Sequence, residues 1–259
     1  RGVTEFNVIA QDLSAYGTDL KAAEAREQSP LAHLIDRMAD IDGVRRIRLH
    51  YAYPKDFPMD VLDVMARRDN VCRYLDIALQ HISDPVLKNM RRHINGAQTR
   101  ELLDEMRRRV PGIHIRTTLM VGFPGEDEAA FEELLDFVRE QRFERMGAFA
   151  YCEEEDTYAA KNFADEVPEE VKQERLDALM AEQHEISEDI QAGKVGQTFT
   201  VLIDSEEDDF YVGRTEFDSP EVDPEVLVYK TRPMQVGEYV DVEITGATAF
   251  ELYGKEKLS

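Results

Sequence analysis

The feature that most restricts how this chain can fold is a regular alternation of short apolar segments and amphipathic segments over residues 1–190. The amphipathic segments place apolar residues three and four positions apart, which is typical of helices. Strands that alternate with helices, and that are apolar on both faces, predict a parallel sheet with crossover helices. The expected strands are 6–10, 46–51, 74–79, 113–121 and 146–151.

Five strand–helix units are too few for a closed eight-stranded barrel, which needs about 250 residues. We therefore expect an α/β fold in which the parallel strands form an open, partial TIM-like barrel. The clearest helix is 30–39, where four apolar side chains share one face. Further helices are expected from residue 58, at 86–92, at 98–109, around 131–138 and, as a long charged helix, at about 168–191.

From Gly193 onward the apolar residues recur at every second position instead, as in 199–203 and 240–244. This period indicates strands, and several short strands separated by glycines predict a small antiparallel barrel of five strands. The acidic run 206–209 is expected at a hairpin tip. We therefore predict two domains, 1–191 and 192–259. The other short strands are expected at 210–213, 226–229 and 248–252.

Polar residues, aromatics and glycines stand where the expected strands end. Gln11 and Asp12 follow the first strand, Gln80 the third and Gly122 the fourth, and Tyr151 ends the fifth. Ligands of parallel α/β folds bind at the carboxyl ends of the strands, so these residues are expected to meet at one mouth. Local structural roles remain open as alternatives. Gln11 and Asp12 could simply cap a helix, and Gly122 could belong to a tight turn.

The sequence offers no metal site and no hydrolytic site. Cys72 and Cys152 have no partner at metal-ligand spacing, which favours free thiols in a reducing cytosol. None of the six histidines pairs at His-x-x-x-His spacing. No Ser-His-Asp or Cys-His set and no phosphate loop is recognisable, so the catalytic residues stay unknown.

The chain is strongly acidic, with 31 Lys and Arg against 54 Asp and Glu and a net charge of −23. Residues 193–259 alone carry six basic and fifteen acidic residues. Such a surface repels phosphate backbones and attracts basic partners, although solubility alone is the simpler explanation.

Several segments resemble those of the radical SAM methylthiotransferases in order and spacing. Among them are LHYAYP at 49–54, DIALQHIS at 76–83 and RTTLMVGFPGE at 116–126, and residues from 193 onward resemble a TRAM domain. The resemblance runs through essentially the whole chain. Further matching segments are 11–17, 90–92 and 151–157.

This resemblance implies an enzyme that uses S-adenosylmethionine (SAM) and two 4Fe–4S clusters. In the family, a Cys-x3-Cys-x2-Cys loop holds the cluster that cleaves SAM, and the resulting radical removes hydrogen from a substrate carbon. The second cluster takes part in sulfur delivery, and a second SAM supplies the methyl group. Neither that loop nor an N-terminal cysteine domain is present here, so we expect a truncated piece that is inactive alone and begins at a cut edge, at Arg1.

The resemblance also implies which residues contact SAM at the mouth. Gln11 and Asp12 suit the methionyl amino group of SAM. Gln80 and Arg92 suit its ribose or its carboxylate, because the guanidinium fork of an arginine matches a carboxylate. Val121 and Gly122 are expected beside the adenine of SAM, and Tyr151 is expected to line the SAM pocket. The full set is Gln11, Asp12, Gln80, Arg92, Val121, Gly122 and Tyr151.

The resemblance leaves the substrate open, because relatives that modify tRNA share both domains. The acidic C-terminal domain favours the branch that modifies the β-carbon of an aspartate in a basic small-subunit ribosomal protein. A tRNA methylthiotransferase and a non-catalytic adaptor that only binds a partner remain as alternatives. We expect a cytoplasmic monomer with no strong nucleic-acid binding and no membrane span.

Overall fold

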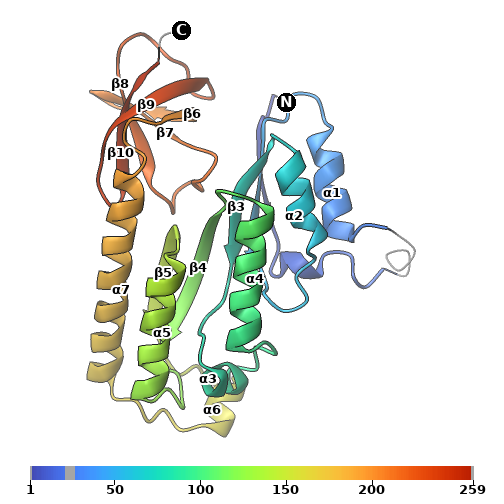
Figure 1. The fold of residues 1–259 in the computed structure, drawn as a ribbon, viewed down its shortest axis with the longest axis vertical. Coiled ribbons are helices and arrows are strands. Elements are labelled where there is room, and N and C mark those ends of the chain that lie inside the picture. The colour runs from blue at the N-terminus through green and yellow to red at the C-terminus, as the bar shows by residue number, and fades with distance from the viewer. Residues whose placement is uncertain (1, 21–26, 258–259) are drawn as a thin grey trace. The chain divides into compact units, whose positions relative to one another are not determined.

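The computed structural model describes residues 2–20 and 27–257. The chain forms two compact units, Arg1–Gln183 and His184–Ser259, and each is considered by itself (Figure 1).

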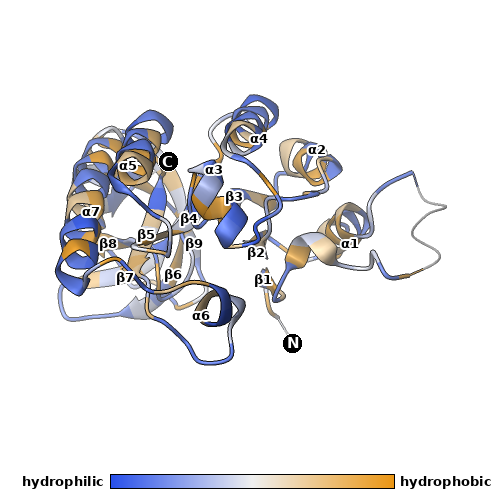
Figure 2. Cartoon of the chain, turned by 90° about the horizontal axis from the view of Figure 1, so that it is seen from below, coloured by the Kyte–Doolittle hydropathy of each residue, from blue (hydrophilic) through white to orange (hydrophobic). Residues whose placement is uncertain are grey.

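The first unit is built on a five-stranded sheet in which every pair of neighbours is parallel. The strand order is β1-β2-β3-β4-β5, so each crossover moves one strand further in the same direction. Because such crossovers are right-handed, they place their helices on one face of the sheet, as Figure 2 shows for α1, α2, α4 and α5. The predicted open barrel is thus confirmed. The strands are β1 Glu5–Ile9, β2 Arg46–Ala52, β3 Val71–Ile77, β4 His114–Val121 and β5 Arg145–Ala150.

Side-chain caps fix where several helices begin. Ser29 accepts a hydrogen bond from the Ala32 amide at the start of α1, and Asp127 accepts one from the Ala130 amide at the start of α5. Asn95 forms a reciprocal capping box at the start of α4. The helices are η1 Leu13–Ala15, α1 Pro30–Ala39, α2 Asp60–Arg67, α3 Asp84–Asn89, α4 Gly96–Arg109, α5 Glu128–Gln141, α6 Tyr158–Asn162 and α7 Glu169–Ala192.

Some boundaries differ from the predictions. The strand expected at 74–79 is displaced toward the N-terminus, and Gln80 turns with a φ of 71°. The helix expected at 86–92 ends early, because Arg91 and His93 adopt left-handed backbone angles of 57° and 55°. Helix α6 was not predicted at all. It buries no residue, so it leaves no apolar period in the sequence.

Strand β4 separates the two faces of the sheet. Ile115, Leu119 and Val121 are fully buried, whereas Arg116 and Thr118 at the alternate positions are half-buried. The buried series faces the crossover helices and forms the core. The opposite, inner face carries polar residues.

The second unit contains a closed barrel in the order β10-β8-β7-β6-β9. All but one of the neighbouring pairs are antiparallel, and β10 and β8 run parallel. A closed ring with an odd number of strands must contain at least one parallel pair. The predicted small barrel of five strands is thus confirmed, with β10 and β8 as that pair. The strands are β6 Thr198–Glu206, β7 Phe210–Arg214, β8 Glu225–Tyr229, β9 Tyr239–Ala247 and β10 Glu251–Glu256.

The barrel core consists of the alternating apolar residues, among them Val201, Val226, Val242 and Leu252. The predicted acidic hairpin tip is confirmed, since the Glu207 amide donates to the Phe210 carbonyl across it at 2.9 Å. The last strand begins three residues later than predicted, because the Thr248 hydroxyl accepts backbone hydrogen bonds and closes a turn. No helix within 2–20 or 27–257 is both long and apolar enough to cross a membrane.

Candidate functional site

Three neighbouring strand ends are joined at the carboxyl edge of the parallel sheet. The Gln80 amide donates to the Thr118 carbonyl at 2.9 Å, and the Met120 amide donates to the Gln80 carbonyl at 2.8 Å. The Tyr151 amide donates to the Val121 carbonyl at 2.8 Å. The ends of β3, β4 and β5 therefore form one continuous edge, on which Gln80, Gly122 and Tyr151 lie.

The ends of β1 and β2 meet through a serine hydroxyl. Ser14 Oγ accepts from the Tyr53 amide at 2.9 Å and donates to the Tyr53 carbonyl at 3.1 Å. Asp12 accepts from the Ser14 amide at 3.0 Å and caps η1, so the local capping alternative holds for this residue. Gln11 follows β1 with an exposed side chain.

Arg92 brings a half-buried cation to the same edge. Its guanidinium lies 4.1 Å from the centroid of the Tyr53 ring and donates to the Ala78 carbonyl. The Tyr53 hydroxyl donates to the Arg92 carbonyl at 2.9 Å. Burial lowers the pKa of Arg92, opposed by Tyr53 and Asp12. The Nε atom is buried and has no hydrogen-bond partner within the described residues.

A buried ionic cluster holds the loop that follows β4. Glu126 accepts from the Gly122 amide at 2.9 Å and from Arg175 Nη1 at 2.8 Å. Its other oxygen lies 3.0 Å from His81 Nε2. His81 Nδ1 accepts from the Ser83 amide, so the ring proton is on Nε2 and points at the carboxylate. The cluster ties the loop to the turn after β3 and to α7.

Gly122 and Val121 occupy this edge through their backbone. Gly122 has a φ of 73°, and a Cβ atom there would lie 2.3 Å from Lys172 Cγ, so only glycine fits. The Val121 side chain is completely buried on the same face as Leu119. Only its backbone therefore reaches the edge.

Tyr151 contributes a second buried polar atom without a partner. The residue is 6% exposed, and its ring lies edge-on to Phe123 with centroids 4.9 Å apart. Lys172 Nζ lies 5.4 Å from the ring centroid. The hydroxyl is buried and accepts or donates no hydrogen bond among the residues described. Burial, with smaller contributions from nearby acids, raises the pKa of Tyr151.

A polar network on the inner face of the sheet was not predicted from the sequence. The Arg48 side chain is 0% exposed and donates to Glu5 at 2.5 Å and Asn7 at 2.9 Å. Its guanidinium lies 5.5 Å from the Tyr74 ring centroid. His50 Nδ1 lies 3.6 Å from Asp76 Oδ2. One signal in the sequence could have revealed this network. Arg46, Arg48 and His50 stand at every second position of a strand that was expected to be apolar on both faces, which indicates a polar face.

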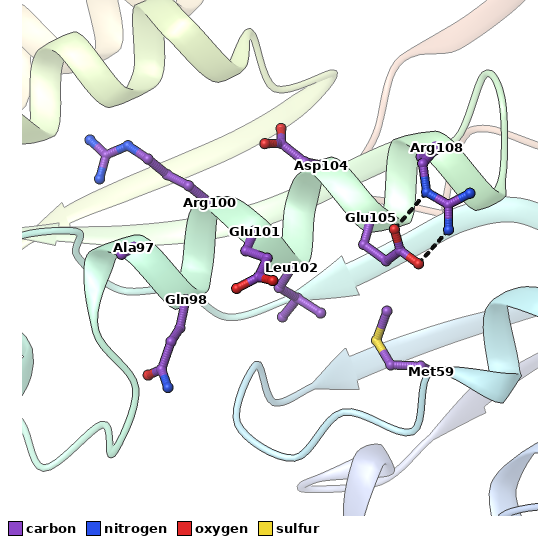
Figure 3. Close-up of a pocket in the computed structure, with 9 residues that line it drawn as sticks. All are labelled: Met59, Ala97, Gln98, Arg100, Glu101, Leu102, Asp104, Glu105 and Arg108. Atoms are coloured by element: carbon purple, nitrogen blue, oxygen red, sulfur yellow. Dashed lines mark hydrogen bonds and ion pairs between the residues drawn. The ribbon is translucent and has the colours of Figure 1, made fainter.

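The largest concave regions described on this chain include one on the outer side of the first unit. This concave region of about 810 Å³ lies along α4 and is lined by Gln98, Glu101 and Arg108 among others (Figure 3). Glu105 and Arg108, three residues apart on α4, join through hydrogen bonds of 2.6 and 2.7 Å. Its lining includes none of the predicted site residues. Arg100 in the lining pairs instead with Glu133 and Glu140 outside it.

The described residues contain no group of three or more His, Cys, Asp or Glu able to hold a metal ion. Cys72 is buried and Cys152 is exposed, and neither forms a disulfide. The edge thus presents polar and aromatic groups suited to an organic ligand with charged ends, namely Arg92, Gln80 and Tyr151.

Comparison with known proteins identifies both units. Residues 16–138 match the sequence model of the Radical SAM superfamily, and residues 195–256 match that of the TRAM domain. The solved structure of coproporphyrinogen III oxidase (HemN) from Escherichia coli, a radical SAM enzyme, gives a TM-score of 0.49 at 19% identity. That superposition covers 61% of this chain and 38% of the other, and it is too distant to carry an argument.

Curated relatives match almost the whole chain. Ribosomal protein uS12 methylthiotransferase RimO of Parabacteroides distasonis is 60% identical over 255 residues, which is 98% of this chain and 58% of that protein. The protein of the same name from Bacteroides thetaiotaomicron is 57% identical over 256 residues, with the same shares. The chain spans a little over half the length of these relatives. It belongs to the radical SAM superfamily and, within it, to the methylthiotransferase family of these relatives.

Proposed function

We propose that this chain is the part of a radical SAM methylthiotransferase that binds SAM and the protein substrate, and that the substrate is the ribosomal protein uS12. The names of its relatives support this reaction. The observation that carries the SAM site is the pair of buried, unpartnered polar atoms at one sheet edge, Arg92 Nε and Tyr151 Oη. Such atoms are rare in folded proteins and favour a missing ligand.

The edge suits the parts of SAM in a definite order. Arg92 is fixed by Tyr53 below it and by the Ala78 carbonyl, so its free Nε can bind a carboxylate without reorganising. The exposed Gln11 and the Asp12 carboxylate suit an ammonium group. Gly122 allows a flat base to approach the backbone closely. Tyr151 can bind a ribose hydroxyl or stack against the base.

SAM bound beside a 4Fe–4S cluster supplies a carbon radical that removes hydrogen from the substrate. The described residues hold no ligand set for such a cluster, so we assign no residue to either of the two clusters expected in this family. The chain's own groups bind and orient the cofactor. The buried Glu126 cluster keeps the loop after β4 rigid, and the crossover helices exclude water from one face of the sheet.

The acidic barrel supports a protein substrate in preference to tRNA. Residues 193–259 carry fifteen acidic and six basic residues, a net charge of −9. Binding RNA requires Lys and Arg that displace phosphate counterions, whereas this barrel attracts a basic ribosomal protein. We also propose that the enzyme is cytoplasmic, because its proposed substrate is a component of the ribosome, and that it acts as a monomer.

Mass spectrometry of purified uS12 tests the proposal. The longest protein that contains this chain, with its clusters reconstituted, is incubated with SAM, a reductant and either uS12 or bulk tRNA. We expect a methylthio group on one aspartate of uS12 and none on tRNA. Modification of tRNA alone would establish the tRNA branch. Binding of uS12 without cleavage of SAM and without modification of either substrate would favour the adaptor.

A further inference from the structure

The outer face of β7, β8 and β10 carries aromatic side chains instead of the polar residues usual outside a small barrel. Val226, Val228 and Leu252 point into the barrel core. The side chains at alternate positions therefore point outward. They include Phe210, Leu227, Tyr229 and Tyr253, which we call the aromatic patch.

The patch is continuous and accessible. Phe210 pairs with Tyr229 across β7 and β8, and Tyr253 pairs with Leu227 across β10 and β8. The Phe210 ring centroid lies 5.0 Å from that of Tyr229 and 6.3 Å from that of Tyr253. Tyr229 is 45% exposed, and the other three are half-buried. The rings thus support one another and leave their outer surfaces open.

Carboxylates stand at one end of the patch. Glu225 and Glu251 pair directly across β8 and β10, so two negative charges lie side by side. Partial burial and then the neighbouring acids Glu207, Asp204 and Glu251 raise the pKa of Glu225. The Tyr253 hydroxyl donates to Glu251 at 2.5 Å, which links the patch to the acids.

Two basic side chains of the neighbouring strands are already engaged, and the exposed Lys255 follows Tyr253 on the outward face of β10, at the other end of the patch from Glu251. Lys230 pairs with Glu206 at 2.8 Å, and Arg214 pairs with Asp204 at 2.7 Å. No Lys or Arg of the described barrel forms an ion pair with Glu225 or Glu251. The like charges at this end therefore lack a cation, and an incoming cation would relieve their repulsion.

We propose that the aromatic patch, with Glu225 and Glu251 at its end, binds an arginine- and lysine-rich polypeptide segment. A guanidinium can lie flat on the exposed rings and donate a forked pair of hydrogen bonds to a carboxylate, which a lysine does less well. The assignment of this segment to uS12 rests on the proposed function. The preference of the aromatic patch for arginine and lysine does not depend on that function, because it follows from the rings and carboxylates alone.

Single-stranded RNA is the competing ligand, because bases also stack on exposed aromatics. A strand bound here would bring its phosphates against Glu225, Glu251 and Glu207, and only Lys255, at the other end of the patch, could neutralise one of them. The carboxylates therefore favour the basic peptide.

Binding is measured by fluorescence anisotropy with the full chain and three labelled probes: purified uS12, a nona-arginine peptide and a uridine decamer. The first variant, Phe210→Ala with Tyr229→Ala, removes two rings. The second, Glu225→Gln with Glu251→Gln, removes only charge and keeps side-chain size, so it reports even if the first variant unfolds. Controls are Phe250→Ala, an exposed phenyl of the same unit that lies against His184, and Glu188→Gln on α7.

We expect each patch variant to weaken binding of uS12 and the peptide by about tenfold, a change within the range of a few cation–π contacts and charge-assisted hydrogen bonds. The controls should stay within about twofold. Unchanged peptide binding in both patch variants would overturn the proposal. It would also be overturned if the unmodified chain bound the uridine decamer more tightly than the peptide and the patch variants lost that binding. If the peptide binds at the aromatic patch and uS12 does not bind, the patch remains a site for basic peptides and the proposed substrate is refuted. If neither is bound, both proposals fail.

Discussion

The buried cluster around Glu126 makes a quantitative prediction for the stability of the first unit. The Glu126 side chain is 0% exposed and that of Arg175 is 9% exposed. Glu126→Gln keeps the shape but leaves the guanidinium buried without its closest carboxylate, and it turns an amide group toward His81 or the Gly122 amide. Removing one member of a buried pair costs about 3–5 kcal/mol.

We expect the low end, about 3 kcal/mol, because Glu128 still lies 3.2 Å from Arg175 Nη2. For a unit of this size, each kcal/mol lowers the melting temperature by about 2–4 °C, so the loss should be about 6–12 °C. The chain has no tryptophan, so differential scanning calorimetry is the suitable assay.

Two further variants make the test specific. Glu133→Gln removes an acid that is 43% exposed and pairs loosely with Arg100 at 3.9 Å, so it should change stability by less than about 0.5 kcal/mol. Arg175→Met combined with Glu126→Gln should lose much less than the sum of the single changes. Additive losses, or a Glu126→Gln protein that melts like the wild type, would refute the reasoning.

Three other predictions follow from single sites. Gly122→Ala should destabilise the first unit by about 2–4 kcal/mol in urea unfolding, against about 1 kcal/mol for Gly237→Ala, where the φ is also positive but the space is open. Arg92→Ala should weaken SAM binding by the intact protein about tenfold in calorimetry, while Arg108→Ala on the outside of α4 leaves it unchanged; equal affinities would remove Arg92 from the site. Hydrogen bonds from Arg108, and then from Arg109, hold the pKa of Glu105 at about 2. The ionised Glu105 carboxylate therefore stabilises the folded state at any pH above its ordinary pKa, and this stabilisation is lost as the pH falls through about 2. Carbon-13 NMR should show this midpoint rising in Arg108→Ala, and an unmoved midpoint would contradict the pairing.

Much of the first unit was predictable because one face of its sheet obeys a simple rule. Ile115, Leu119 and Val121 recur at every second or fourth position of β4, and burial of this apolar series fixes the register of the strand. Sequential strands joined by single helices leave few topologies. For the same reason, the sequence placed Gln80, Gly122 and Tyr151 on a common edge without any contact being known.

The parts that escaped prediction depend on contacts between distant residues. Arg48 is buried only because Glu5 and Asn7, from another strand, supply its hydrogen bonds, and no local pattern announces such partners. The end of β3 depends on Gln80 adopting a left-handed angle, which asparagine or glycine would have signalled and glutamine does not. Arg175 reaches Glu126 across 49 positions of sequence.

The central claim is that SAM binds across the carboxyl ends of β1, β3, β4 and β5. Amide hydrogen exchange of the intact protein, with and without SAM, tests it most directly. We predict that SAM slows exchange at 11–14, 78–81, 121–124 and 151–153 together. Exchange that is unchanged at these segments, or slowed only along α4, would contradict the claim.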